Sequence, residues 1–327
     1  MPSSKAGRAS VFTVSLLAAL TASLRAKAQT QTPTQAQGFA VERFYPSAPG
    51  GGWLVMDSLD MHGGLGGAMS VTAGYEKDPL RIANGAQNLA VVSDRAFVAF
   101  GFAATYERFR LSLNLDAPVV TRGQSGIVGN DQFTDSSLTL GSHPDTLSDA
   151  RVGLDVRLLG EPGGPFRLGA GAQLFIPNGD RADYDTDGTY RAMFRALFAG
   201  DVRFITYAAH LGVHVRPVND SATPQSPEGS ELLFGVAAGA KVPVFKGTEA
   251  LIVGPEIFGA TAFRSFFGGT TTALEGLLTG RLETTGEQGP QLRIKLGAGV
   301  GLHTEFGAPT WRLLLSVELL GHNPDRK

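Results

Sequence analysis

Three aspartates at alternate positions are the clearest candidates for metal chemistry in this chain of 327 residues. Asp183, Asp185 and Asp187 precede Gly188, and the pattern D-x-D-x-D-G is the start of a calcium-binding loop built from oxygen ligands. The complete motif needs a bidentate glutamate at its twelfth position, which is Phe194 here. Two hypotheses stay open: an acidic loop kept soluble by its charge, and a partial site for Ca²⁺ or for bridging lipopolysaccharide.

No arrangement of nucleophile, base and acid indicates an enzyme. The six histidines are not accompanied by serines or paired acids in a catalytic pattern. His210 and His214 are four residues apart, and in a strand this spacing separates them by roughly 13 Å, too far for one zinc ion. The chain has no cysteine, which excludes disulfides and thiolate chemistry. We predict no catalytic activity, and no cofactor other than calcium at the aspartate loop.

Basic residues recur on one side of segments that alternate between polar and apolar positions. That side holds thirteen bases and seven acids by this alternation, and cationic side chains that line a pore favour anions. In the alternative, these bases and acids form ion pairs with one another across neighbouring strands and fill the interior of a narrow β-barrel. The acids are Asp116, Asp155, Asp201, Glu256, Glu275, Glu283 and Glu318. The candidate lumen-facing bases are Arg110, Arg151, Arg157, Arg167, Arg195, Lys241, Arg293, Lys295 and Arg312, with Arg191, Arg203, Arg216 and Arg281 on the same side.

The segments that carry these residues have the period of two expected for a β-strand with two different faces. In residues 291–302, Leu, Ile, Ala and Val occupy one face, whereas Arg293, Lys295 and three glycines occupy the other. The same alternation recurs in residues 110–118, 151–158 and 311–319. Glycine accounts for 43 of the 327 residues, about 13 %, against the roughly 7 % of an average protein. The pattern predicts an all-β chain.

Three features favour a transmembrane barrel over a soluble β-sandwich. The segments run for roughly 10 to 14 residues, which is enough to cross a bilayer at a tilt. Their apolar face carries almost no charge, and aromatic residues such as Trp53, Tyr106, Phe204 and Trp311 lie at segment ends, as in an interfacial girdle. Backbone groups in hydrocarbon must all be hydrogen-bonded, so the sheet has to close. We therefore predict a closed antiparallel transmembrane β-barrel.

Short and long connections alternate along the chain, which predicts periplasmic turns and longer outer loops, including one over residues 78–88. Twelve such connections join thirteen strands between Trp53 and Leu320. An exported chain starts on the periplasmic side, so an even number is needed, and residues 38–45 can supply the additional strand. We predict fourteen strands, with twelve as the alternative if residues 38–61 form a plug or rim.

The N-terminal region resembles an export signal. Lys5 and Arg8 precede an apolar run over residues 9–24, and a small-x-small site ends at Ala28. This run is the only long apolar segment, which excludes a bundle of membrane helices. Cleavage leaves 24 Lys and Arg against 30 Asp and Glu, a balance that does not favour nucleic acid. The predicted parts are a signal peptide (1–28), a flexible lead-in (29–37), the barrel (38–320) and a short periplasmic tail (321–327).

The start of the mature chain resembles a known class of proteins. Residues 38–67, GFAVERFYPSAPGGGWLVMDSLDMHGGLGG, together with the repeated hairpins and the closing segment 310–320, are similar to the N-terminal barrel of OmpA-type outer-membrane proteins. In such relatives an Asp-rich linker and a peptidoglycan-binding domain follow the barrel. This chain stops at Lys327, where that linker would begin, so the resemblance does not extend to cell-wall anchoring.

These observations predict one of two functions in the cell outer membrane. The first is a passive pore for small solutes with a preference for anions. The second is a closed structural or surface-display barrel without transport activity. In both cases the expected partners are membrane lipid, lipopolysaccharide and the barrel-assembly machinery.

Overall fold

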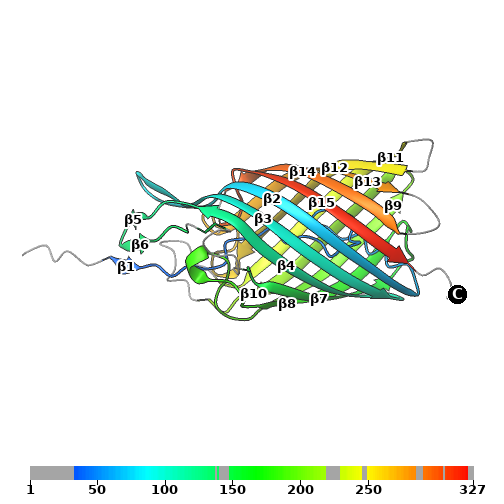
Figure 1. Cartoon of the computed structure of the whole chain (residues 1–327), viewed down its shortest axis with the longest axis horizontal. Coiled ribbons are helices and arrows are strands. Elements are labelled where there is room, and N and C mark those ends of the chain that lie inside the picture. The colour runs from blue at the N-terminus through cyan, green and yellow to red at the C-terminus, as the bar shows by residue number, and fades with distance from the viewer. Residues whose placement is uncertain are drawn as a thin grey trace, which may run out of the picture. The chain divides into compact units, whose positions relative to one another are not determined.

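Twelve antiparallel strands form a closed barrel, which confirms the predicted all-β fold (Figure 1). The computed structural model describes residues 33–136, 138–139, 147–218, 229–244, 249–284, 290–304 and 306–322, so the predicted signal peptide lies outside the described residues. Residues 1–34 and 35–327 form two separate units, and the barrel belongs to the second. Within the described part of the chain, no helix has the length and apolar character needed to cross a membrane.

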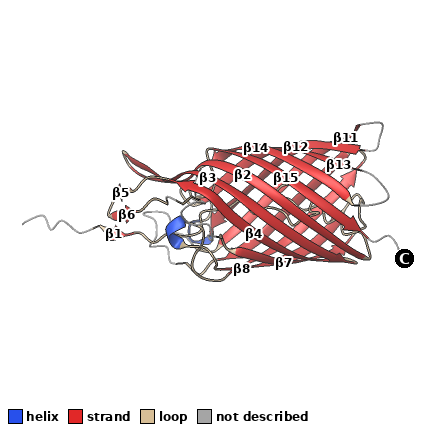
Figure 2. Ribbon diagram, in the orientation of Figure 1, coloured by secondary structure: helices blue, strands red, loops and turns tan. Residues whose placement is uncertain are grey.

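Strands that follow one another along the wall are joined as hairpins, apart from the seam that closes the ring (Figure 2). Two short strands, β5 (Gly126–Val128) and β6 (Asp131–Phe133), lie in the connection between β4 and β7, and β1 (Thr34–Gln35) precedes the wall. The wall strands are β2 (Leu65–Asn84), β3 (Gln87–Tyr106), β4 (Phe109–Arg122), β7 (Ala150–Leu159), β8 (Arg167–Ile176), β9 (Arg191–Val202), β10 (Ile205–Val215), β11 (Glu231–Val244), β12 (Glu249–Ala262), β13 (Thr272–Thr284), β14 (Gln291–His303) and β15 (Trp311–His322).

The ring closes where β15 pairs with β2. Twelve residue pairs form this seam, from Trp311 opposite Lys77 to His322 opposite Gly66. Backbone N–H and C=O groups that would stay unpaired at the edge of an open sheet are therefore hydrogen-bonded across the seam. The wall also ends at His322, two residues beyond the predicted boundary.

The connections differ in length between the two ends of the barrel. At one end, the short-turn end, only two residues join β3 to β4. At the other, the long-loop end, the connections include residues 123–149, 177–190 and 216–230. β2 begins and β15 ends at the short-turn end. The alternation of short and long connections agrees with the sequence pattern.

The wall has the smaller of the two predicted strand numbers. Residues 38–61, which the fourteen-strand prediction used as two strands, instead lie inside the barrel, where Phe44 and Trp53 are buried. Their apolar residues do not alternate, and Pro46 and Pro49 have no N–H group to contribute to a ladder. The first wall strand accordingly begins at Leu65.

The predicted outer loop over residues 78–88 is wrong. β2 and β3 continue as a hairpin to Asn84 and Gln87, which are paired with each other. The register shifts between Lys77 and Leu80, which brackets Asp78 and Pro79. Their turn-like composition suggested a loop, but a bulge tolerates a proline because no ladder hydrogen bond is required there.

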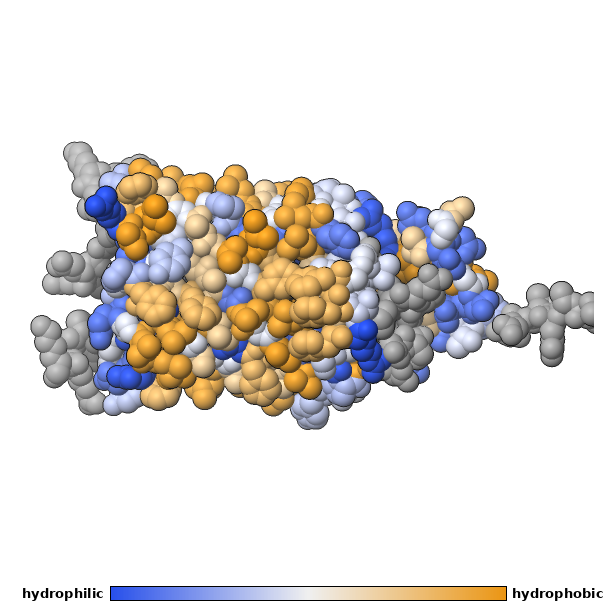
Figure 3. Space-filling view, turned by 180° about the vertical axis from the view of Figure 1, so that it is seen from behind, coloured by the Kyte–Doolittle hydropathy of each residue, from blue (hydrophilic) through white to orange (hydrophobic). Residues whose placement is uncertain are grey.

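Large apolar side chains cover the outer face of the wall, whereas charged ones lie inside. In β14, Leu296 and Val300 are exposed and Lys295 is buried. Figure 3 shows the apolar side chains gathered over the middle of the molecule, with polar residues toward its ends. Tyr106 and Phe204 are exposed at strand ends, but Trp53 is fully buried inside the barrel, so its assignment to the aromatic girdle is wrong.

Because the ladder is closed, we expect the folded protein to resist unfolding in SDS until it is boiled. Unboiled and boiled samples should migrate differently on a gel. Equal migration of a refolded sample under both conditions would contradict the closed barrel.

Candidate functional site

Residues 38–61, hereafter the plug, run through the barrel from the long-loop end to the short-turn end. At the long-loop end, Arg181 Nε donates to the carbonyl oxygen of Gly38 at 2.6 Å. At the short-turn end, the backbone N–H of Gly163, in the turn between β7 and β8, donates to Asp60 Oδ1 at 3.0 Å. The plug therefore extends along the full length of the lumen.

A tight turn lies in the middle of the plug. Gly50 and Gly52 adopt φ angles of 84° and 92°, a backbone conformation that residues with a Cβ rarely adopt. The Ser58 N–H donates to the carbonyl oxygen of Gly51 at 2.6 Å, and an isolated bridge joins Gly52 to Asp57. The glycines therefore allow the chain to fold back on itself within the lumen.

This turn directs three consecutive backbone N–H groups at one carboxylate of the wall. The N–H groups of Leu54, Val55 and Met56 donate to Glu256 at 2.9, 2.9 and 3.1 Å. The Thr279 hydroxyl donates to the same carboxylate at 2.7 Å. Successive N–H groups of this kind form a nest that binds an anion. Glu256 on β12 therefore helps to fix the turn to the wall.

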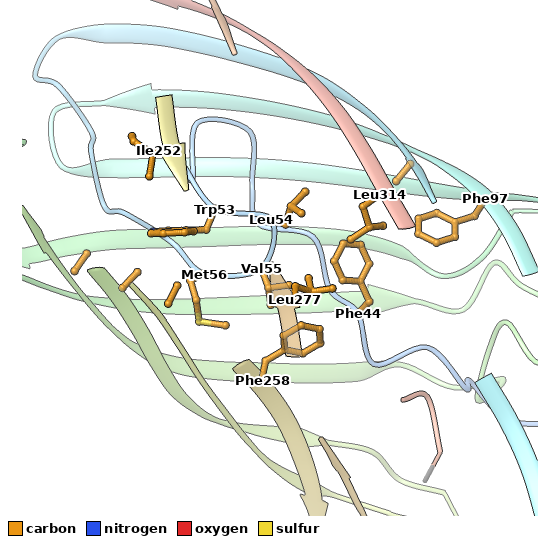
Figure 4. Close-up of a cluster of buried hydrophobic side chains, with 14 residues drawn as sticks. Phe44, Trp53, Leu54, Val55, Met56, Phe97, Ile252, Phe258, Leu277 and Leu314 are labelled. Atoms are coloured by element: carbon orange, nitrogen blue, oxygen red, sulfur yellow. The ribbon is translucent and has the colours of Figure 1, made fainter. Parts of the chain in front are cut away.

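Apolar side chains of the plug pack against the inside of the wall (Figure 4). Trp53 and Met56 are completely buried. The Arg281 guanidinium lies over the Trp53 ring at 5.6 Å from its centre. The plug residues of the cluster are Phe44, Trp53, Leu54, Val55 and Met56, and its larger wall residues are Phe97, Ile252, Phe258, Leu277 and Leu314. The lumen thus contains a hydrophobic core like the one that stabilises a soluble domain.

Ion pairs fix the plug near the short-turn end. Asp57 pairs with Arg110 of β4, and both side chains are fully buried. Arg110 also pairs with Asp155 of β7 at 2.8 Å. Asp60 pairs with Arg167 of β8 at 2.8 Å, but about a quarter of the Asp60 side chain is exposed.

A second group of ion pairs fixes the plug near the long-loop end. Glu42 lies 3.2 Å from Arg312 of β15 and 3.4 Å from Arg95 of β3. The neighbouring Arg43 pairs with Glu231 of β11 at 2.7 Å. Adjacent plug residues of opposite charge therefore bind opposite charges on three different wall strands.

The structure places most of the candidate bases inside the barrel. Arg293 is partly buried, and Lys241 is exposed. Arg151 Nη2 donates to the Pro46 carbonyl oxygen at 2.9 Å, and Lys295 Nζ donates to that of Trp53 at 3.0 Å. The buried members of the set are Arg110, Arg151, Arg157, Arg167, Arg195, Lys295 and Arg312.

Carboxylates beyond the seven inward acids compensate many of these bases. Three of them, Glu42, Asp57 and Asp60, come from the plug. Others come from the long loops, where Asp149 pairs with Arg191 at 2.8 Å. The inward excess of bases counted along the strands is therefore reduced by acids from other parts of the chain.

Two of the candidate calcium ligands bind arginines. Asp185 lies 2.6 Å from Arg95, and Asp187 lies 2.7 Å from Arg216. Asp183 is in a short 3-10 helix, η1 (Arg181–Asp183). Within the described ranges, no three His, Asp or Glu side chains are grouped closely enough to hold one metal ion. The calcium site stays a prediction from the sequence.

Asp187 also anchors the start of the plug. Its Oδ1 accepts the Ala40 N–H at 2.9 Å. Burial alone would raise the pKa of Asp187, but Arg216 and Arg191 outweigh burial and hold that pKa well below its ordinary value. The aspartate loop therefore serves as a charged support for the plug.

The alternation of polar and apolar residues placed Glu256 among the inward acids but did not reveal its role. Its partners are backbone N–H groups some 200 positions away. The side chains of residues 54–56 do not predict such a contact, because every residue except proline carries the same backbone N–H group.

Comparisons with known proteins reveal similarity in structure alone: no family model and no curated protein matches the chain. The chain is similar to an outer membrane channel from Pseudomonas putida F1, with 14 % identity, 80 % of this chain and 95 % of that chain covered, and a TM-score of 0.48. It is also similar to the NanC porin, with 6 % identity, 78 % of this chain and 100 % of that chain covered, and a TM-score of 0.46. Its similarity to the CymD monoaromatic hydrocarbon channel has 9 % identity, covers 81 % of this chain and 90 % of that chain, and gives a TM-score of 0.40. The OmpA-type resemblance stays a prediction.

Two matched substitutions test whether burial determines the strength of the plug's ion pairs. Asp57→Asn should lower the free energy of unfolding by about 2–3 kcal/mol, because it removes a charged hydrogen bond from a fully buried pair. Asp60→Asn should cost at most about 1 kcal/mol, because solvent reaches Asp60. Urea unfolding in detergent, followed by tryptophan fluorescence, measures both values. Equal losses would contradict this ranking.

Proposed function

We propose that this protein is an outer-membrane β-barrel channel that its own plug keeps closed. The observation that carries the proposal is the position of residues 38–61, which occupy the lumen and bind the wall through buried ion pairs and a shared hydrophobic core. We propose a passive role for it, without catalysis.

The outer face of the barrel supports its placement in a membrane. The wall strands have 10 to 20 residues, enough to span a bilayer at a tilt. Leu111, Leu154, Phe194 and Leu296 are each about half exposed on this face. A hollow lined by Leu111 and other apolar residues would accept an acyl chain. Membrane lipid and lipopolysaccharide are thus the proposed surroundings, and the barrel-assembly machinery the proposed route of insertion.

The interior supports a channel whose conduction depends on the plug. The wall presents Arg110, Arg167 and Arg312 to the lumen, and each has a plug carboxylate as a partner. With the plug in place these charges are neutralised and the path is occupied. Without the plug these guanidinium groups would keep the wall carboxylates Asp155, Asp201 and Glu275 but lose their plug partners, so the lumen would become more positive and favour anions.

A closed structural barrel is the second candidate. The complete burial of Trp53 and Met56 favours it, because exposing such large buried apolar side chains to water is costly. The two candidates differ in one measurable property, which is whether the barrel conducts once the plug is removed or loosened.

Removal of the plug should open an anion-selective path. Deletion of residues 38–61 removes Glu42, Asp57 and Asp60 but only one base, Arg43, so the lumen becomes more positive. In planar bilayers the full chain should show no steady conductance, and the deletion variant should conduct with a reversal potential that indicates chloride over potassium. Steady conductance of the full chain would refute the closed state. A folded deletion variant that does not conduct would favour the structural barrel.

A milder variant addresses the possibility that the deletion prevents folding. Glu256→Ala removes the carboxylate that holds three plug N–H groups, so we expect brief openings absent from the full chain. The matched control is Glu283→Ala, which also removes one inward carboxylate, but whose ion pairs within the described residues are with the wall bases Arg281 and Arg293. Both variants should keep the gel shift on heating. Openings of equal frequency in the two variants would contradict the proposal that Glu256 holds the plug in place.

A further inference from the structure

In the wall, the first strand begins and the last strand ends at the same end of the barrel. β2 begins at the short-turn end, and β15 ends there as well, because Gly321 pairs with Gly67. Twelve strands run an even number of times from one end of the barrel to the other. A barrel without a plug would therefore place the chain before β2 and the chain after β15 at the same end.

The plug adds one further passage through the lumen. After the plug, the Gly64 carbonyl oxygen accepts the N–H of Glu107 at the short-turn end, at 3.1 Å. Before the plug, the Ala36 N–H donates to the Gln132 carbonyl oxygen at 2.9 Å, and Gln35 Nε2 donates to Thr134 Oγ1 at 3.0 Å. Both of these partners lie in the connection between β4 and β7, at the long-loop end.

Several contacts hold the start of the plug at this end. The Phe39 ring packs edge-on against Tyr184 and Phe306, with ring centres 6.2 and 5.6 Å apart. The Val41 N–H donates to the Tyr184 carbonyl oxygen at 3.1 Å. Phe39 and Val41 also belong to a buried cluster that includes Leu80 from the β2–β3 hairpin. The chain therefore passes through a packed layer formed by the long loops.

We propose that the barrel displays its N-terminal chain on the face that carries the long loops. Gln35 is held at that face, opposite the end where Gly321 closes the wall. If long loops face outward, as is usual for outer-membrane barrels, this face is the cell surface. The stretch QTQTPTQAQ at residues 29–37 is polar and uncharged, which suits a hydrated tether open to soluble partners.

The proposal rests on the proposed function only in placing the barrel in a membrane. It does not depend on conduction, because the number of passages is the same whether or not the plug loosens. It also predicts a relation that does not depend on orientation: Gln37 must share its side with the β2–β3 hairpin tip.

Single cysteines test this relation, because the chain contains none of its own. The test variant is Gln37→Cys, an exposed position. The matched controls are Ala86→Cys at the β2–β3 tip and Arg108→Cys in the β3–β4 turn, both also exposed. Intact cells that express each variant are treated with a membrane-impermeant maleimide, and a lysed sample gives full labelling. Each variant is first checked for the gel shift on heating.

We expect intact cells to label Gln37→Cys to the same extent as Ala86→Cys, and Arg108→Cys to react only after lysis. Labelling of Gln37→Cys that follows Arg108→Cys would overturn the proposal. If Ala86→Cys and Gln37→Cys are both protected and Arg108→Cys reacts, the shared side holds but surface display is wrong. Reaction of all three in intact cells would contradict membrane placement, and with it the proposed function.

Discussion

A charge inside the barrel loses its hydration and must be compensated by an opposite charge or by hydrogen bonds. Arg312 illustrates how this requirement ties the structure together. It contacts Glu42 of the plug at 3.2 Å, Glu76 of β2 at 2.7 Å and Glu275 of β13 at 2.9 Å. One guanidinium thus joins the plug to two strands of the wall. Buried arginines suit this role because their donors form a rigid fork that several carboxylates can share.

The plug has two kinds of contact with the wall, apolar and charged. Near its middle, apolar side chains around Trp53 form a core, and Glu256 binds backbone N–H groups. Toward its ends, Glu42 and Asp60 bind arginines. The apolar contacts supply burial, whereas the charged contacts define where each residue sits. The same segment therefore fills the lumen and compensates part of its positive charge.

The long-loop end is more than a set of connections. Arg216 links Asp187 of one loop to Glu231 at the start of β11, at 2.7 Å in both cases. Asp187 in turn receives the Ala40 N–H of the plug. Together with the buried cluster around Phe39, these bonds make the loops a cap over the lumen. The aspartates that suggested calcium in the sequence belong to this cap.

The two faces of the wall could be predicted from the sequence alone. Alternation in segments such as residues 291–302 reflects a local constraint, because neighbouring side chains of a strand must face opposite environments. The same rule placed Arg110, Lys295 and Glu256 on the inner face, and the connection lengths separated the two ends. These features depend only on residues close together in the chain.

The segment that occupies the lumen could be identified only from the folded structure. The apolar residues of 38–61 have no period that distinguishes an interior segment from two irregular strands, and Trp53 resembled a girdle residue. The partners of Asp57 and Glu42 are 53 and 270 positions away. Likewise, the pairing of Asp185 with Arg95 depends on loops that meet only after the ring closes. Compensation of buried charge is a property of the assembled interior, so it leaves no local pattern in the sequence.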